Sequence, residues 1–229
     1  MAAAPASQTL SRGIRILEIL ADGPLTIDEI AGRLEVHRSI AYRLLRTLED
    51  HRLVVRDSAG RASLGPRMAA LAAGVAHDLQ AEALPELTTV ANEFALTAFL
   101  VVLDGDECIT LTSVEPRHAV AGLAQRPGSR HPVTVGAPGK AILAQLPDAQ
   151  WPAVPDALRA EVDLARERGY ATSRDEVIPT VGSVAVPLAL RARRPAALAV
   201  VHVASRIPDA EIAARLRRSA EDIRESLGG

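Results

Sequence analysis

Five side chains that can bind nucleic acid lie between residues 38 and 46, and they are Arg38, Ser39, Tyr42, Arg43 and Arg46. At intervals of three and four residues, such side chains share one face of a helix. Guanidinium groups bind phosphates and the edges of bases, and hydroxyl groups contact both as well. The row therefore indicates a helix that presents a basic face to the major groove of DNA.

A helix presents such a face only when its opposite face is buried. The opposite face here is apolar, through Ile40, Leu44, Leu45 and Leu48. A shorter helix precedes it, because Thr26 and Glu29 have the spacing of a capping box and a break follows at residues 35–36. The two segments predict a helix-turn-helix motif. The alternative is a solvated, charged helix in an ordinary helical domain, since many unrelated helices show a helix-turn-helix sequence pattern.

Two short segments typical of strands follow, at residues 53–56 and 61–64, on either side of turn-forming residues. A hairpin directly after a recognition helix would be the wing of a winged helix. The residues expected to reach base edges are Arg38, Ser39, Tyr42 and Arg43. The residues expected to contact phosphates are Thr26, Arg46, Arg56 and Arg61.

The chain has 229 residues, enough for two modest domains, and 48% of them are hydrophobic, which excludes a largely disordered protein. The net charge is −2, yet basic residues outnumber acidic ones in the first 67 positions and are outnumbered in the rest. A basic N-terminal segment followed by an acidic remainder is consistent with a DNA-binding domain joined to a second domain.

Cys108 is the only cysteine, so the chain has no internal disulfide, and a reduced, cytoplasmic setting is expected. Residues 1–9 lack the basic and apolar segments of a secretion signal and are expected to be disordered. No run reaches the roughly 18 apolar residues of a membrane span, so a membrane partner is not expected.

We assign residues 1–65 to the DNA-binding domain, residues 66–78 to a linker helix and residues 79–229 to a second domain. Pro85 should separate the linker helix from a second helix at about 85–95. Strand patterns occur at 97–104, 107–114, 119–125, 182–190 and 196–204, and helical patterns after 136, at 157–170 and at 208–227. Hairpins mixed with helices predict an α+β sensor-type domain and not a doubly wound nucleotide fold.

In order and spacing, several motifs together resemble the IclR family of bacterial transcriptional regulators. They are RGIRILEIL (12–20), RSIAYRLLRTLEDHRLV (38–54), LGPRMAAL (64–71), GAPGKAILA (136–144), GYATSRDE (169–176) and GSVAVPL (182–188). The resemblance implies a winged helix-turn-helix domain, a linker helix and a GAF-like α/β effector-binding domain. It also implies homodimers through the DNA-binding domain, often paired into dimers of dimers. The chain departs from the family's pattern at Ile40, where threonine is frequent, and at Ala62, where tyrosine is usual.

In the family the effector, usually a small carboxylate or aromatic acid, lies in a cup in the second domain. By position, the cup would include Val120, Ala137, Pro138, Ser173, Arg174, Asp175, Gly182, Ser183, Ala199, Val201 and His202. Several positions that are serine or cysteine in the family are glycine, alanine or valine here. A less polar cup suits a bulkier or more apolar molecule, with Arg174 or His202 as its charge partner.

Other chemistry is disfavoured. The GAPGK segment lacks the glycine and the hydroxyl residue of a phosphate-binding loop, because Thr134 and Ala141 stand at those positions. Cys108 lies in a strand pattern with no histidine near it in sequence, which favours packing over nucleophilic catalysis. His118 and His131 do not have metal-ligand spacing. We therefore expect no metal, no cofactor and no catalytic residue.

These observations predict a ligand-responsive transcriptional regulator that binds a near-palindromic operator as a dimer, with repression or activation left open. The alternative is an enzyme acting on a small organic acid, with the winged helix serving only oligomerisation. The sequence shows neither the nucleophile–base pair nor the paired carboxylates that such an enzyme would need. A winged helix used only for protein contacts is a third possibility, which leaves the arginine row unexplained.

Overall fold

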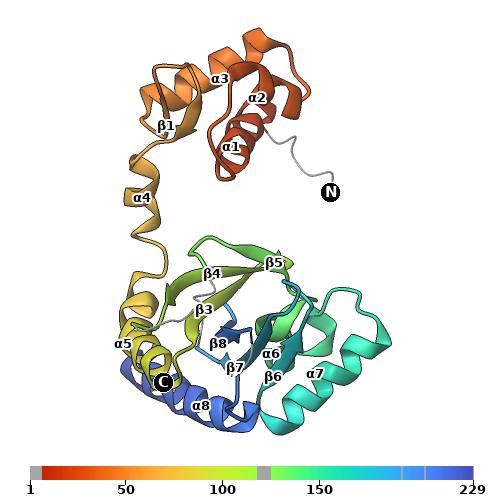
Figure 1. Ribbon diagram of the computed structural model, residues 1–229. Helices are drawn as coiled ribbons and strands as arrows, with labels where there is room; N and C mark the ends of the chain where they lie inside the picture. The colour runs from red at the N-terminus through yellow and green to blue at the C-terminus, as the bar shows by residue number, and fades with distance from the viewer. Residues whose placement is uncertain (1–6, 118–124, 192, 204, 229) are drawn as a thin grey trace. The chain divides into compact units, whose positions relative to one another are not determined.

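The computed structural model describes residues 7–117, 125–191, 193–203 and 205–228 (Figure 1). The chain divides into two compact units, residues 1–75 and 76–229. Each is considered by itself.

The first unit is a winged helix. Its elements are α1 (Gln8–Leu20), α2 (Ile27–Arg33), α3 (Arg38–Asp50), β1 (Val54–Arg56), β2 (Ala62–Leu64) and α4 (Arg67–Ala72). The predicted helix-turn-helix and its hairpin are both present, and β1 pairs with β2 in antiparallel register. Ile16, Ile30 and Leu45, each fully buried, join the three helices in one core.

Two local predictions for this unit are wrong. Gln8 and Thr9, expected to be disordered, are helical because the hydroxyl of Ser7 caps α1 by accepting the N–H of Leu10. The linker helix was expected to cover residues 66–78 but ends at Ala72 in α4. A turn that contains Gly74 and a left-handed Ala76 follows it.

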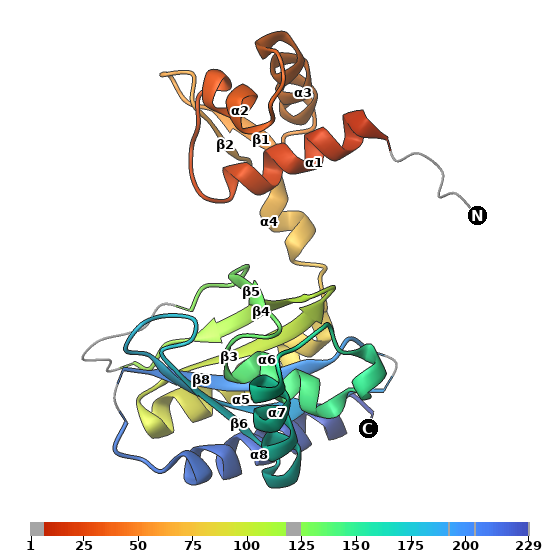
Figure 2. The same cartoon turned by 90° about the vertical axis from the view of Figure 1, so that its right-hand side faces the viewer.

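The second unit has one six-stranded antiparallel sheet covered on both faces (Figures 1 and 2). Its strands are β3 (Thr97–Asp104), β4 (Glu107–Val114), β5 (Arg130–Pro132), β6 (Ala171–Arg174), β7 (Gly182–Leu188) and β8 (Ala196–His202), in the order β5-β4-β3-β8-β7-β6. Its helices are α5 (His77–Phe94), α6 (Gly136–Gln145), α7 (Asp156–Arg168), α8 (Asp209–Ser226) and the short 3-10 helix η1 (Asp148–Gln150). The predicted α+β class is confirmed.

Alternation along the strands assigns each residue to one of two cores. On β3, Ala98, Leu100 and Val102 pack with α5 and α8, whereas Phe99 and Val101 pack with α6 and α7. This follows from the two-residue period of a strand. Because both faces are covered, β3 is buried almost throughout, which explains its nearly continuous apolar sequence.

Pro85 does not end a helix, contrary to expectation, but lies inside α5. The apolar stripe of α5 continues across it, from Leu79 and Ala83 to Leu87 and Val90. Pro85 itself is on the exposed side. An interior proline costs about 3 kcal/mol, and burial of the stripe on the sheet outweighs that cost.

Two strands were not anticipated: β5 lies where a loop was expected, and β6 was expected to be part of a loop around Ser173 and Arg174. The predicted strand at 119–125 falls almost entirely outside the described residues. In the part of the chain that is described, no helix is both long and apolar enough to cross a membrane.

Candidate DNA-binding and effector sites

The exposed face of α3 carries the predicted basic row. Ala41, Leu44, Leu45 and Leu48 are buried on its other side, and Ile40 is half-buried. Arg38, Ser39, Tyr42, Arg43 and Arg46 are all exposed. The fold therefore leaves this face available to a partner, as the spacing predicted.

The arginines of this unit differ in their intramolecular contacts. Arg38 pairs with Asp28 at 3.3 Å, and Arg56 pairs with Glu49 at 2.6 Å and lies over the Tyr42 ring. Arg61 donates to the carbonyl of Pro24 at 2.6 Å. Among the described residues, the guanidinium groups of Arg43 and Arg46 have no ion pair or hydrogen bond, so they are the freest donors on α3.

Thr26 caps α2. Its hydroxyl accepts the N–H of Glu29 at 3.3 Å, and its own N–H donates to Glu29 Oε2 at 2.7 Å. The Glu29 carboxylate accepts the backbone N–H of Thr26 and also its hydroxyl, the latter at 2.8 Å, and these two bonds, the backbone one first, hold the pKa of Glu29 below its usual value. The predicted capping box is confirmed, and the same cap keeps Thr26 at the N-terminus of α2, where a phosphate could approach.

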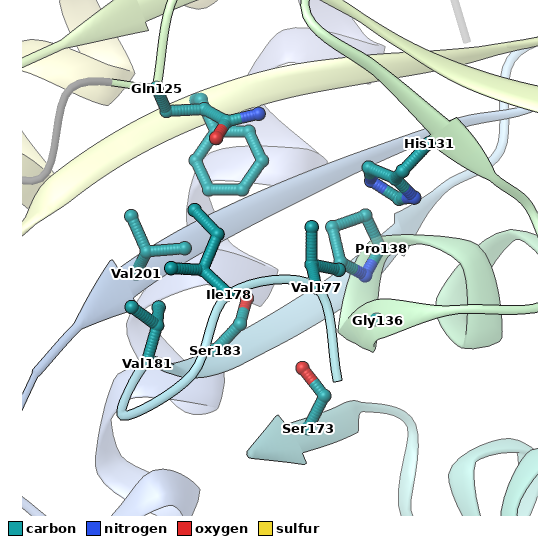
Figure 3. A pocket seen from close by; sticks show the side chains of 11 residues that line it. Gln125, His131, Gly136, Pro138, Ser173, Val177, Ile178, Val181, Ser183 and Val201 are labelled. Atoms are coloured by element: carbon teal, nitrogen blue, oxygen red, sulfur yellow. The ribbon is translucent and has the colours of Figure 1, made fainter. Parts of the chain in front are cut away.

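A pocket in the second unit lies beside the N-terminus of α6, with about 400 Å³ of space that opens to solvent (Figure 3). Its apolar walls are Phe99, Pro138, Val177, Ile178, Val181 and Val201. Its other lining residues are Gln125, His131, Gly136, Ser173 and Ser183. A concave, mostly apolar site with a few polar groups is typical of a small-molecule site.

The loop between β6 and β7 closes one side of this pocket. Val177 and Ile178 lie on that loop in Figure 3. Gly136, at φ +85°, permits the approach, because a Cβ there would lie 2.9 Å from Val177 Cγ2.

A second, polar pocket of about 600 Å³ adjoins the first and shares Ser173 and Ser183 with it. Its other lining residues are Lys140, Glu161, Thr172, Arg174, Glu176, His202 and Asp209. Arg174 and His202, expected to serve a ligand in the cup, therefore line this polar pocket instead of the apolar one.

The cup residues expected from the family resemblance are thus divided. Pro138, Ser173, Ser183 and Val201 meet at the apolar pocket. Ala137 and Ala199 are fully buried core residues, Asp175 accepts the N–H of Thr180 within the loop, and Gly182 packs against the His202 ring. Val120 lies outside the described residues.

Sequence reasoning missed Phe99, Gln125, His131, Gly136, Val177, Ile178 and Val181. For Val177 and Ile178 a signal existed, since an apolar pair interrupts an otherwise polar loop. Val181 lies on the same loop, and only the pairing of distant segments brings the remaining side chains to the pocket.

Cys108 has a histidine neighbour after all, because β4 and β5 place it opposite His131. No histidine lies near Cys108 along the sequence, so this neighbour was not expected. Burial raises the pKa of Cys108 to about 12, however, so its thiol stays protonated and is a poor nucleophile. Among the described residues, no group of three His, Cys, Asp or Glu side chains could hold a metal ion.

His202 should make the stability of the second unit depend on pH. Burial, and then the Arg174 charge, lower its pKa below the ordinary 6.5, with Asp209 opposing. The unfolded chain therefore binds a proton more readily than the folded one, so stability is complete above about 6.5 and declines as the pH falls below it. Urea unfolding at several pH values, followed by Trp151 fluorescence, should show this decline weakened in His202→Gln. An equal decline in both proteins would contradict the assignment.

Two family models match the chain. The IclR helix-turn-helix domain matches residues 9–58, and the bacterial transcriptional regulator IclR C-terminal matches residues 72–225. The probable transcriptional regulator SauR of Cupriavidus necator is 32% identical over 211 residues, which covers 82% of this chain and 83% of that protein.

Solved structures with the same fold cover nearly the whole chain. An IclR transcriptional regulator from Alicyclobacillus acidocaldarius has a TM-score of 0.87 at 30% identity, with 98% of this chain and 100% of that one covered. An IclR homolog from Microbacterium hydrocarbonoxydans, crystallised in complex with 4-hydroxybenzoate, has a TM-score of 0.81 at 27% identity, with 96% and 99% covered.

Proposed function

Because this chain belongs to the IclR family of bacterial transcriptional regulators, we propose that it binds a near-palindromic operator as a homodimer and that a small molecule in the apolar pocket modulates this binding. The family members are DNA-binding regulators and not enzymes. The bacterial chromosome is the partner, so the protein would act in the cytoplasm.

The observation that supports the DNA interface best is the two-sided character of α3. Its buried leucines hold the helix to the unit, and its exposed face carries two arginines, Arg43 and Arg46, without intramolecular partners among the described residues. In this proposal Arg38, Ser39, Tyr42 and Arg43 reach base edges in the major groove. Arg46 binds a phosphate.

The wing and the cap of α2 would supply further phosphate contacts through Thr26, Arg56 and Arg61. Arg56 and Arg61 each use part of their guanidinium group within the unit. A guanidinium has five N–H donors in a fixed plane, so the remaining donors can still bind phosphate oxygens. Their intramolecular bonds would hold them in position for that contact.

Dimerisation through the first unit is supported by α1, where Leu10 is 64% exposed and Ile14 is 48% exposed. Exposed apolar side chains on one helix are often covered by a second copy. Two copies of α3 about one DNA turn apart would read an inverted repeat. We extend the proposal to a dimer of dimers, which sedimentation with and without DNA would test.

The apolar pocket is the proposed effector site. Its walls are mostly apolar and carry a few polar groups, which is the usual lining of a small-molecule site. A structural relative was crystallised with a ring-sized ligand, 4-hydroxybenzoate. A molecule of that size is the natural first probe for this pocket.

Selection from a random DNA pool tests the operator proposal. The purified chain should enrich a near-palindromic sequence and protect it from nuclease digestion. Retention on heparin with a steep salt dependence should accompany this. A pool that stays unenriched, together with no salt-dependent retention, would favour a winged helix that makes protein contacts only.

Arg46→Ala should weaken binding to every DNA sequence alike and leave the selected sequence unchanged. Loss of one phosphate contact lowers the slope of log K against log salt by about 1 per subunit. Fluorescence anisotropy of operator and scrambled duplexes at several salt concentrations measures both effects. A loss confined to the operator duplex would instead assign Arg46 to base recognition.

A further inference from the structure

The N-terminus of α6 is the natural place in this pocket for a negatively charged ligand, because free N–H groups and the helix dipole meet there. In this chain the first two N–H groups of α6 already have acceptors within the protein. The N–H of Gly136 donates to Glu176 Oε2 at 2.9 Å, and the N–H of Ala137 donates to Ser173 Oγ at 3.0 Å. The next residue, Pro138, has no N–H to offer.

The nearest lysine is also engaged. Lys140 is only 3% exposed, and its ammonium group donates to Glu161 and, at 2.6 Å, to Glu176 Oε1. With both carboxylates on it, the Lys140 ammonium is not available to a ligand in the apolar pocket. The single residue Glu176 thus binds both the helix terminus and the cation that a ligand carboxylate would need.

The polar side chains that line the apolar pocket offer a ligand more free hydrogen-bond acceptors than free donors. Gln125 uses one of its two amide N–H groups on Thr110 Oγ1 at 2.8 Å, which leaves one N–H and the acceptor Oε1. His131 Nδ1 lies 3.1 Å from the carbonyl of Pro132 and must donate to it, so Nε2 of the neutral ring is an acceptor. Ser183 donates its hydroxyl to the carbonyl of Val200 at 2.8 Å, and only Ser173 keeps a hydroxyl proton for a ligand.

From these contacts we propose that the effector of this chain is an uncharged molecule with an O–H or N–H donor, and that Glu176 excludes anionic ligands from the pocket. The proposal rests on the proposed function, which assigns the apolar pocket to an effector. A carboxylate would find few donors between the apolar walls, because Glu176 and Ser173 already accept the N–H groups at the start of α6. A phenol, alcohol or amide of ring size would instead donate to Gln125 Oε1 or His131 Nε2.

Isothermal calorimetry on the full chain, without DNA, tests the ligand class with two isosteric probes, 4-hydroxybenzamide and 4-hydroxybenzoate. The probes differ only in the charge and the N–H donors of one group. We expect the amide to bind at least about tenfold more tightly, since an unpaired buried charge is strongly disfavoured. Equal or tighter binding of the anion overturns the proposal, and so does failure of both probes to bind at millimolar concentration.

Glu176→Ala should free the N–H of Gly136 and the ammonium of Lys140, so the preference for the amide should shrink or reverse. Glu161→Gln is the matched control, because Glu161 contacts the same lysine but not Gly136. It should keep the wild-type preference. A preference unchanged in Glu176→Ala would overturn the role of Glu176. Circular dichroism melting checks that both variants fold, and the wild-type comparison tests the ligand class without them.

The effect of each probe on operator binding separates this proposal from the proposed function. If the amide binds but leaves operator affinity unchanged, the ligand class stands and the effector role fails. If the anion binds preferentially and changes operator affinity, the effector role stands and the ligand class fails.

Discussion

Arg43→Ala is expected to abolish sequence-specific operator binding and to leave the fold and the oligomeric state intact. Arg43 is exposed in the middle of the α3 row, and among the described residues its guanidinium has no partner, so its removal breaks no contact within the unit. A bidentate arginine–guanine contact contributes about 1–3 kcal/mol of discrimination. A dimer loses this contribution in both half-sites.

Competition between operator and scrambled duplexes measures the specificity of this variant, and sedimentation measures its oligomeric state. Arg224→Ala is a control of equal charge change, because Arg224 is exposed on α8 in the other unit. It should bind the operator as the wild type does. Undiminished operator preference in Arg43→Ala would remove α3 as the recognition helix.

Leu45→Ala should destabilise the first unit and thereby weaken all DNA binding. Leu45 is fully buried and packs α3 against the other helices of the unit. Truncation of a buried leucine costs about 2–5 kcal/mol, a large share of the roughly 5–15 kcal/mol that stabilises a typical domain. Without this packing, the basic face of α3 loses its fixed orientation.

The only tryptophan makes this prediction easy to assign to one unit. Trp151 belongs to the second unit, so its fluorescence should report an unchanged transition, while the circular dichroism of the helices should show an earlier one. Leu45→Met, which conserves volume, should cost less than about 1.5 kcal/mol. A Leu45→Ala chain with wild-type melting would show that α3 does not depend on this buried contact.

The sequence alone was sufficient for the elements whose period is local. The apolar and basic faces of α3, the capping box at Thr26, the wing and the apolar strand β3 were all predicted from neighbours within a few residues. Hydrophobic period and capping depend on spacing along the chain. They therefore can be read without knowledge of distant partners.

Only the tertiary structure decided how the second unit builds its pockets. Glu176 lies 40 residues from Gly136 in the chain. The two residues meet only because β6, which Glu176 follows, packs beside α6. Packing against the sheet likewise keeps α5 continuous through Pro85. Such outcomes depend on long-range pairing and on burial against another element. Neither leaves a local period in the sequence, so the winged helix was predictable and the lining of the apolar pocket was not.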